Sequence, residues 1–580
     1  MAITNAKAEM KFIDTTALAD STVSTQSGQD IDNLALLSED DVSSVSDYGT
    51  LEKNLFILDG SKVIPSNPRD IGFISSEMSD QNCNFINIPS VEVDFTVNHT
   101  SSGLTLYFDR DYPAEIKITW YTLNGSELTS KVYHPDSLEY ICVNQVKNYG
   151  KLKIEFLKTN LPNQYARLQY ILYGKYVKWH GGTIKKASVV EDIDIVSAQI
   201  SINTANIEIL DIDSDFDIGN PNGAWLSVQK NQPVKLSEEI DGVEIPMGSF
   251  FIDKFSFTDN TAKFSMIDTV GLLDQSTFYD GEIYVKRTAG AIIDSIMASA
   301  GITKYTVSEE VAEIELNGYL AIQTCRKALQ IVAFVCGAVI DDSKSDTIAI
   351  YKPVRPVRYT IDIDRKFNGN TKVSLDDYYS GVSIEFSKYS LKSESDEIYS
   401  DYLPVGDNTI TFSNPYKPDT ITVSGGTIKK VATNYIEVTM DSEAECTITG
   451  QQYESSKFTT SQRVSQLDAG ESENIKKYTG ITLYNAQTVK ETMASIMKYL
   501  RLRKEVKIKY LIQTEKVGDW GIIKDREGRS NLSLIEKQTI DLTGGFISTS
   551  ENRGYTLINT NGYFAGNELI ANEGIGGALL

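Results

Sequence analysis

The chain has 580 residues with 55 basic and 79 acidic side chains, which gives a formal net charge of −24. A chain of this length predicts several domains, each with its own core. The acidic excess excludes a protein that wraps duplex DNA or rests on an anionic membrane, because both functions need a basic face.

Cysteine usage and hydropathy indicate synthesis in a reducing cytoplasm without membrane insertion. The five cysteines are scattered and form no CxxC pair, so we expect neither a disulfide framework nor a zinc knuckle. The most apolar stretch, Ala328 to Ile340, contains Gln330 and is too short to cross a bilayer. The opening MAITNAKAEMKF lacks the apolar core of a signal peptide.

The first third of the chain divides into an arm and a β domain. Residues 1–48 are rich in Ser, Thr, Asp and Ala with weak periodicity, which predicts an extended arm that takes its order from neighbouring elements. Residues 49–175 show short alternating strands, such as the run from Val91 to Val97, and a turn at Asn124-Gly125. This pattern predicts a β-sandwich.

A second β-rich region covers residues 176–286, with one strand predicted around Ile207 to Ile212. A helical insert, residues 287–353, follows it, and we expect two amphipathic helices there. Thr288 caps the first helix and Gly301 ends it. Thr324 and Gly337 have the same roles in the second helix.

Strands resume in residues 354–549, where one further helix is predicted from Ala486 to Arg503 after Asn485. Residues 550–580 form a Gly- and Asn-rich tail.

The hexapeptide GGTIKK occurs twice, at Gly181–Lys186 and at Gly425–Lys430. Each copy opens a β-rich stretch, so the repeat predicts a duplicated module, although turn-plus-strand sequences also recur by chance.

The densest cluster of carboxylates is DIDSDFDIGN, which starts at Asp211. A calcium loop of the helix-loop-helix type needs a glycine at its sixth place and a glutamate at its twelfth, but Phe216 and Asn222 stand there. In a strand the four aspartates would share one face. We interpret the cluster as a solvated or inter-subunit acidic edge, with a cation site as the alternative. The side chains concerned are Asp211, Asp213, Asp215 and Asp217.

Catalytic chemistry is poorly supported. The chain has only three histidines, His99, His134 and His180, and none lies in a GxSxG, HExxH or Cys/His context. We expect His99 and His134 to lie in loops. With 79 carboxylates, no pair for glycoside hydrolysis is distinguished by its spacing. We therefore predict no enzymatic activity, no catalytic residue and no cofactor.

A row of aromatic residues precedes the second β region and could stack against sugar rings. Core or interface packing is the stronger interpretation, because tyrosines at strand spacing usually serve that purpose. The residues are Tyr165, Tyr170, Tyr173, Tyr176 and Trp179.

From Tyr176 onward the sequence resembles the hub-type tail-tip and baseplate proteins of bacteriophages. The stretches that carry the resemblance include GSFFIDKFSFTDNTAKFSMIDTVGLLD, LAIQTCRKALQIVAFVCGAVI and VGDWGIIKDREGRSNLSLIEKQTIDLTGGFIST. Their order extends over about two thirds of the chain. Within residues 49–175, TLEKNLFILDGS, IGFISSEMSD and the stretch from Ser130 to Gly174 are similar to the N-terminal portion of tail proteins in prophages of Gram-positive bacteria, a portion that looks like a carbohydrate-module sandwich.

The resemblance implies a fold that is mainly β. An N-terminal β-sandwich would be followed by two β-barrel-like tail-tube modules, residues 176–286 and 354–549, separated by the small helical insert. In the family a trimer of such chains forms a ring of pseudo-sixfold symmetry that continues the tail tube. Many relatives carry a peptidase or muramidase after the hub, for which we expect no room after residue 549.

We therefore expect a structural virion protein of a tail tip or baseplate, made in the cytoplasm of a bacterial host. The expected partners are two further copies in a homotrimer, the tail tube, distal tail or baseplate proteins, the tape-measure protein and receptor-binding proteins, with DNA only as passing cargo along an acidic lumen. One alternative is a receptor-binding tail protein that attaches to a host surface glycan through its sandwich. A tail-associated carbohydrate-degrading enzyme is the other alternative.

Overall fold

The computed structural model describes residues 4–25, 31–32, 72–108, 111–212, 214–220, 223–468, 470–557, 563–565 and 568–570. The fold is mainly β with few helices, as the sequence predicted. Most of the predicted tail, residues 550–580, and much of the predicted arm, residues 1–48, lie outside the described residues. Within the tail only a short pair is described after residue 557, β38 (Tyr563–Ala565) with β39 (Glu568–Ile570).

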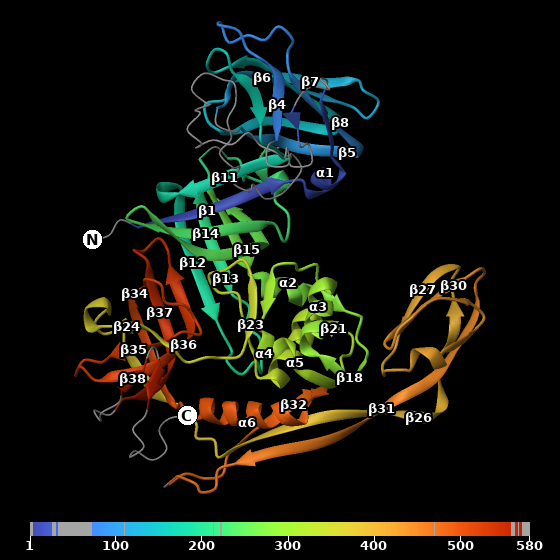
Figure 1. Ribbon diagram of the computed structural model, residues 1–580, viewed down its shortest axis with the longest axis vertical. Coiled ribbons are helices and arrows are strands. Elements are labelled where there is room, and N and C mark those ends of the chain that lie inside the picture. Colours follow the sequence, from blue (N-terminus) through green and yellow to red (C-terminus); the bar gives the residue numbers. More distant parts are fainter. Residues whose placement is uncertain are drawn as a thin grey trace, which may run out of the picture.

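One large sheet of 13 strands runs through the middle of the molecule (Figure 1). Its strands come from both halves of the chain and enclose one buried core. In spatial order they are β11 (Gly174–His180), β1 (Thr4–Ile13), β14 (Pro233–Ile240), β15 (Val243–Thr258), β16 (Thr261–Ile267), β13 (Thr204–Leu210), β12 (Ile184–Asp192), β36 (Ser530–Asp541), β37 (Ile547–Thr556), β34 (Lys504–Leu511) and β25 (Lys372–Leu375), with β35 (Trp520–Lys524) beside β36 and β24 (Val357–Ile361) beside β35.

The seam between the two halves is the antiparallel pair β12–β36, which extends from Ser188↔Asp541 to Asp192↔Lys537. Val189 and Ile540 lie opposite each other in this pair, and both are fully buried. Backbone hydrogen bonds therefore join the two predicted tube modules into one continuous sheet.

The N-terminal segment is part of this sheet. Strand β1 lies between β11 and β14, and its alternate residues Ala8, Met10 and Phe12 are buried. A side chain at Gly174 would place its Cβ 1.8 Å from the carbonyl oxygen of Phe12. Only glycine allows β11 to approach β1 this closely. The segment expected as an extended arm thus begins as a strand that neighbouring elements hold on both sides.

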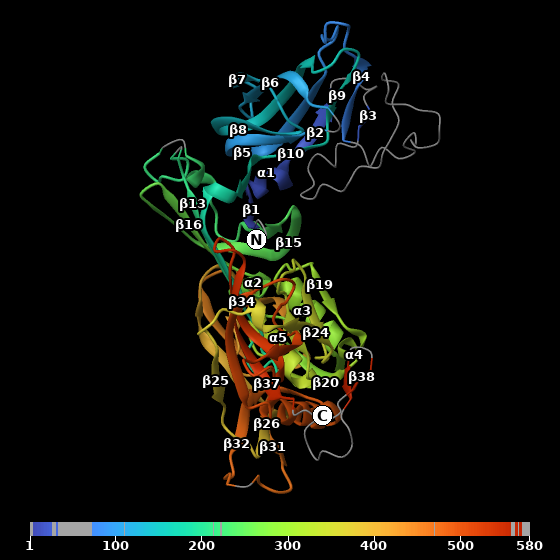
Figure 2. The ribbon, with the colours of Figure 1, turned by 90° about the vertical axis from the view of Figure 1, so that its left-hand side faces the viewer.

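A β-sandwich lies above the large sheet, at the top of Figures 1 and 2. The stacked rings of Phe73 and Phe156, 5.6 Å apart, join its two sheets in one core. The first sheet holds β10 (Tyr170–Leu172), β5 (Ser90–Tyr107), β8 (Glu139–Thr159), β6 (Pro113–Tyr121), β7 (Glu127–Tyr133) and β2 (Thr22–Thr25), and the second holds β3 (Ile31–Asp32), β4 (Phe73–Met78) and β9 (Tyr165–Leu168).

The helical part packs against the large sheet around a second core (Figure 1). Its helices are α2 (Thr269–Gln275), α3 (Ala289–Ser299), α4 (Glu309–Ala312), α5 (Cys325–Cys336) and α6 (Ala486–Leu500). Short strands connect them: β17 (Thr277–Phe278) with β21 (Gln323–Thr324); β18 (Ile283–Thr288) with β20 (Glu315–Tyr319) and β33 (Leu483–Tyr484); and β19 (Tyr305–Val307) with β23 (Ile348–Tyr351) and β22 (Val339–Asp341).

The helix ends show why the sequence signals were informative. The Thr324 hydroxyl accepts a hydrogen bond from the backbone N–H of Lys327 at 3.2 Å, and Gly337 ends α5 in the left-handed region at φ +62°. The Asn485 side chain caps α6 as predicted, whereas Thr288 precedes α3 without a side-chain cap. Helix α6 ends at Leu500, so the last residues of the predicted helix, up to Arg503, are not helical.

A two-stranded β-ribbon extends from the helical part and carries a small lobe (Figure 1). The ribbon is formed by β26 (Gly381–Leu403) and β31 (Ala444–Arg463), flanked by β28 (Thr422–Ser424) and β32 (Ile475–Ile481). The lobe contains β27 (Gly406–Thr411), β30 (Tyr435–Met440) and β29 (Thr427–Val431) around a core of its own.

The two GGTIKK stretches have different surroundings, so the hexapeptide does not mark a duplicated module. The first leads through a short 3-10 turn, Gly181–Thr183, into β12 of the large sheet. The second leads into β29 of the distal lobe, which in the described part of the chain pairs with β30 alone. Six residues set the turn and the strand start, while the partners of each strand come from elsewhere in the chain.

Candidate functional site

The acidic cluster forms a loop after β13, not a strand with four aspartates on one face. Strand β13 ends at Leu210, and the Asp211 carboxylate folds back to accept hydrogen bonds from the backbone N–H groups of Asp215 (3.0 Å) and Phe216 (2.8 Å). Asp217 accepts one from the N–H of Gly219 at 2.9 Å. Aspartates in such turns replace missing backbone partners, which is why the strand predicted around Ile207 to Ile212 already ends at Leu210.

The same loop is anchored by charge and by packing. The Asp215 carboxylate lies 3.4 Å from the Lys175 ammonium group of β11. Phe216 is buried against Phe12 and Trp179, at ring-centroid distances of 5.4 and 5.8 Å. The aspartates therefore shape the loop around a buried aromatic anchor.

The proposed cation site contains Asp213, which lies outside the described residues. Among the described residues, no group of three or more His, Cys, Asp or Glu side chains is placed to hold a metal ion. The carboxylates of Asp211, Asp215 and Asp217 each face a different partner. A bound cation here remains a prediction from sequence.

His99 lies in a buried strand, contrary to the expected loop position, while His134 lies in the loop after β7 as expected. Irregular pairing of β5 with β8 on both sides of His99 broke the alternation that would have revealed the strand. His180 ends β11 and is exposed.

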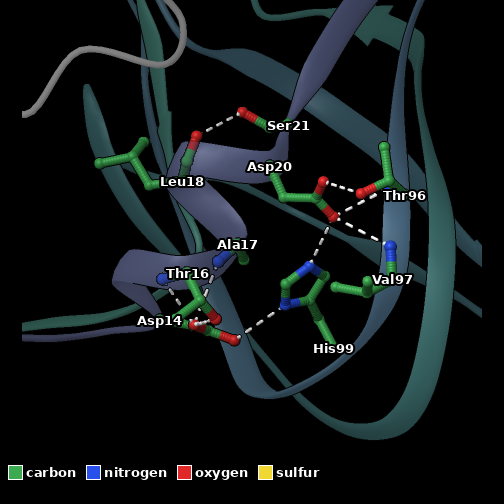
Figure 3. Close-up of polar contacts among 9 residues, drawn as sticks. All are labelled: Asp14, Thr16, Ala17, Leu18, Asp20, Ser21, Thr96, Val97 and His99. Carbon is green, nitrogen blue, oxygen red and sulfur yellow. Dashed lines mark hydrogen bonds and ion pairs between the residues drawn. The ribbon is translucent and has the colours of Figure 1, made fainter. Parts of the chain in front are cut away.

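Two carboxylates hold the imidazole of His99 (Figure 3). Its Nδ1 lies 3.2 Å from Asp14 Oδ2, and its Nε2 lies 3.0 Å from Asp20 Oδ2. These aspartates flank α1 (Thr15–Asp20), a helix of the N-terminal segment that the sequence analysis missed. We call the three side chains the histidine clasp, because they fasten α1 to strand β5 of the sandwich.

Hydrogen bonds hold both carboxylates of the clasp in place. Asp14 Oδ1 accepts from the backbone N–H groups of Thr16 and Ala17 at the start of α1. Asp20 accepts from the backbone N–H groups of Thr96 and Val97 and from the Thr96 hydroxyl. The Thr96 hydroxyl, then His99, lowers the pKa of the Asp20 carboxyl well below its usual range.

This geometry is structural rather than catalytic. A histidine that activates a nucleophile must keep one ring nitrogen available for a hydroxyl or thiol. Both ring nitrogens of His99 face carboxylates. An imidazole in this setting links two acidic side chains, and no sequence motif signals it, because Asp14 and Asp20 are far from His99 in the chain.

The aromatic row is mostly buried. Tyr170, Tyr173 and Trp179 are at most 8% exposed, and Tyr170 stacks on Tyr107 with ring centroids 4.6 Å apart. The hydroxyl of Tyr176 donates to Glu9 of β1 at 2.5 Å. Tyr170 and Tyr173 belong to the core of the sandwich and Trp179 to the core of the large sheet, so these three rings pack inside and do not form an exposed platform for sugar.

A buried polar network crosses the seam between the two halves. Gln538 of β36 donates to the Glu191 carboxylate of β12, and both side chains are at most 1% exposed. Burial raises the pKa of Glu191. Nearby, Glu515 pairs with Arg365 at 2.7 Å. Removing one member of such a network would leave a buried polar group unpaired.

Two further carboxyls join the helical part to the first half of the sheet. Asp268 and Asp342 are at most 6% exposed and are hydrogen-bonded to each other. Burial and the neighbouring carboxylate raise the pKa of Asp268, and burial raises that of Asp342 to about 6. Asn203 donates to both groups. The pair therefore shares a proton around neutral pH.

The large sheet ends in an open edge at β25, which among the described residues pairs with β34 alone. All four of its residues are exposed, and Val373 and Leu375 are 56% and 69% exposed. Val373 lies opposite the buried Val506 of β34, so the core face of the sheet continues uncovered onto its edge. Free backbone groups next to exposed apolar side chains are a template for pairing with another strand.

No protein-family model and no curated protein matches the chain. Several solved structures are similar to it at low identity. They include the 43 kDa tail protein of prophage MuSo2 from Shewanella oneidensis (13% identity, TM-score 0.38, 65% of this chain and 95% of that chain). A tail protein from Neisseria meningitidis MC58 (11%, 0.38, 65% and 93%) and the prophage tail protein gp18 from Listeria monocytogenes EGD-e (6%, 0.36, 65% and 91%) are also similar.

TM-scores below 0.5 establish neither a shared fold nor a shared function. In the described part of the chain, no helix has both the length and the hydropathy needed to cross a bilayer.

Proposed function

We propose that the protein is a structural component of a phage or phage-like tail tip or baseplate, in which it forms a homotrimeric hub that closes the tail tube. The observation that carries the proposal is the open edge at β25, at the end of a sheet that runs through both halves of the chain. The sequence resemblance of the same halves to hub proteins supports it.

The seam β12–β36 gives the hub a rigid unit, because its two modules share backbone hydrogen bonds and a buried polar network. The open edge gives that unit a face for a neighbour. Strand addition satisfies the free backbone groups of β25 and covers Val373 and Leu375. The tail tube and baseplate proteins are the expected partners above and below such a ring, and DNA would pass through it without being held.

Light scattering of the purified full chain, with electron microscopy of the same peak, tests the proposal. A trimer with a central hole is expected. The double variant Val373→Lys with Leu375→Lys should shift the particle toward monomer at the same concentration, because two charges on an edge strand oppose strand addition. Val285→Lys is the matched control, since Val285 is 76% exposed on β18, away from the edge. A compact monomer at all concentrations would contradict the hub.

A further inference from the structure

A cavity of about 300 Å³ lies between α6, the segment before β24 and the start of β35. Thr492, Ser495 and Lys498 line it from α6, and Arg355 and Trp520 line it from the other two elements. We call it the Arg355 pocket.

The charge of the pocket is opposite to that of the protein. Arg355 and Lys498 line it, and no carboxylate does, although the chain carries a net charge of −24. Among the described residues, neither cation has an ion-pair partner. The guanidinium carbon of Arg355 lies 5.2 Å from the centroid of the Trp520 ring. Contact with the ring removes part of its hydration, and burial lowers the pKa of Arg355.

Three other arginines that stack on aromatic rings each have a carboxylate partner. Arg365, Arg503 and Arg553 also stack on aromatic rings, at 5.1 to 5.8 Å. Each of them pairs with a carboxylate at 2.7 to 2.8 Å: Glu515, Glu471 and Asp376 respectively. In the described part of the chain, Arg355 alone among these stacked arginines has no carboxylate partner.

The apolar walls of the pocket favour a ligand that also has an apolar part. Pro353, Ile195 and Val196, which are partly exposed, give it apolar surfaces beside the two cations, and Ser495 is exposed. A simple inorganic anion would leave these surfaces in contact with water. A ligand that carries a carboxylate on a small aliphatic body would use both features, because pockets of this kind combine apolar lining with a few polar groups.

We propose that the Arg355 pocket binds a carboxylate carried on an aliphatic group, with the carboxylate at Arg355 and Lys498 and the aliphatic part on Pro353 and Ile195, beside the Trp520 ring. Two sources have this chemistry: a protein segment in which an acidic residue adjoins a Leu or Ile, and a free aliphatic acid. The proposal goes beyond the hub function and holds whether or not the chain forms a ring.

Calorimetric titration of the full chain tests the proposal with three probes: acetyl-Leu-Asp amide, acetyl-Leu-Asn amide and 4-methylpentanoate. The Asp peptide should bind at least about tenfold more tightly than the Asn peptide, because a carboxylate pairs with guanidinium more strongly than an amide does. Tighter binding of the Asp peptide than of 4-methylpentanoate assigns the site to a protein segment, and the reverse order assigns it to a free acid. Equal binding of the two peptides overturns the proposal.

Single substitutions test whether the ligand binds at Arg355 and Lys498. Arg355→Gln should weaken the Asp peptide by about tenfold or more, and Lys498→Gln by about threefold, since a guanidinium can pair with both carboxylate oxygens and an ammonium acts as a point charge. Arg358→Gln is the matched control, because Arg358 lies close by in β24 but pairs with Asp519 and does not line the pocket. Quenching of Trp520 fluorescence, lost in Trp520→Phe, reports contact with the ring. Unchanged affinity in both Arg355→Gln and Lys498→Gln, with folding verified by circular dichroism, would place the ligand elsewhere.

Discussion

The two halves of the large sheet are joined to each other by one kind of contact, and the sandwich is joined to the sheet by another. The two halves of the sheet meet at β12–β36 through backbone hydrogen bonds, buried apolar side chains and a buried polar network. The sandwich meets the sheet through chain connections and through side-chain contacts, among them the histidine clasp and the bond from Tyr176 to Glu9. The first junction makes one rigid body, and the second attaches a domain through groups that single substitutions can remove.

Placing a charge in the seam should have the largest effect. Ile540→Asp would bury a carboxylate opposite Val189, and we expect a loss of about 4 kcal/mol or more in the free energy of unfolding, because no cation is available there. Thr539→Asp, on the exposed face of the same strand, should cost less than about 1 kcal/mol. Urea unfolding followed by circular dichroism measures both. Similar losses in the two variants would mean that the seam is not a buried junction.

The buried pair Asp268–Asp342 should make the junction with the helical part sensitive to pH. The folded-state pKa of Asp342 is raised to about 6, so the folded state binds more protons than the unfolded state above about pH 4. Stability from this pair is therefore present at low pH and is lost as pH rises through 6. Asp342→Asn should reduce the loss between pH 5 and pH 8 by about 2 kcal/mol.

Thermal unfolding of Asp342→Asn and wild type across this pH range measures the difference. Asp259→Asn is the control, because Asp259 is exposed in the turn between β15 and β16. Parallel pH profiles for all three proteins would contradict the shared proton.

The histidine clasp should show a smaller and more local effect. His99→Gln can serve only one of the two carboxylates, so Asp14 or Asp20 loses the donor from the ring, and we expect a loss of about 1–2 kcal/mol, the range for hydrogen bonds to charged groups. Hydrogen exchange should increase in α1 and in the β2–β5 pair and should stay unchanged at β12–β36. His134→Gln, at an exposed loop position, should change neither. Increased exchange throughout the large sheet would show that the clasp is not a separate junction.

One substitution should stabilise the large sheet by a small amount. Glu238 of β14 is fully buried, and neither of its carboxylate oxygens has a partner among the described residues. Burial, then the nearby Asp541, raises its pKa to about 8. Wild type therefore loses stability as pH rises from the unfolded pKa toward 8, because only the unfolded state ionises freely.

Glu238→Gln removes this penalty, so we expect a gain of about 1 kcal/mol at pH 9 and almost none at pH 4. Denaturant midpoints at the two pH values measure the gain, with the exposed Glu282→Gln as control. A gain of equal size at both pH values would assign the effect to packing and not to charge.

Local signals in the sequence determined the elements of this protein. Thr324 with Gly337 bounded α5, and Asn485 started α6, because capping side chains and a left-handed glycine act on backbone groups within a few residues. Alternating apolar residues indicated the strands of the sandwich, because this alternation also depends only on residues close together in the chain. The acidic loop was located but given the wrong conformation, since hydrogen bonds from Asp211 to its own backbone compete with the strand.

Only the tertiary structure decided which elements meet. The pairing of β12 with β36 joins residues about 350 positions apart, and a repeated hexapeptide could not reveal it, because strand partners are chosen by packing over the whole sheet. His99 and its two aspartates form a clasp only when α1 folds onto β5. The Arg355 pocket likewise combines a loop, a helix and a strand. Sequence sets what each segment can form, and the fold brings distant side chains within the few ångströms over which charges and hydrogen bonds act.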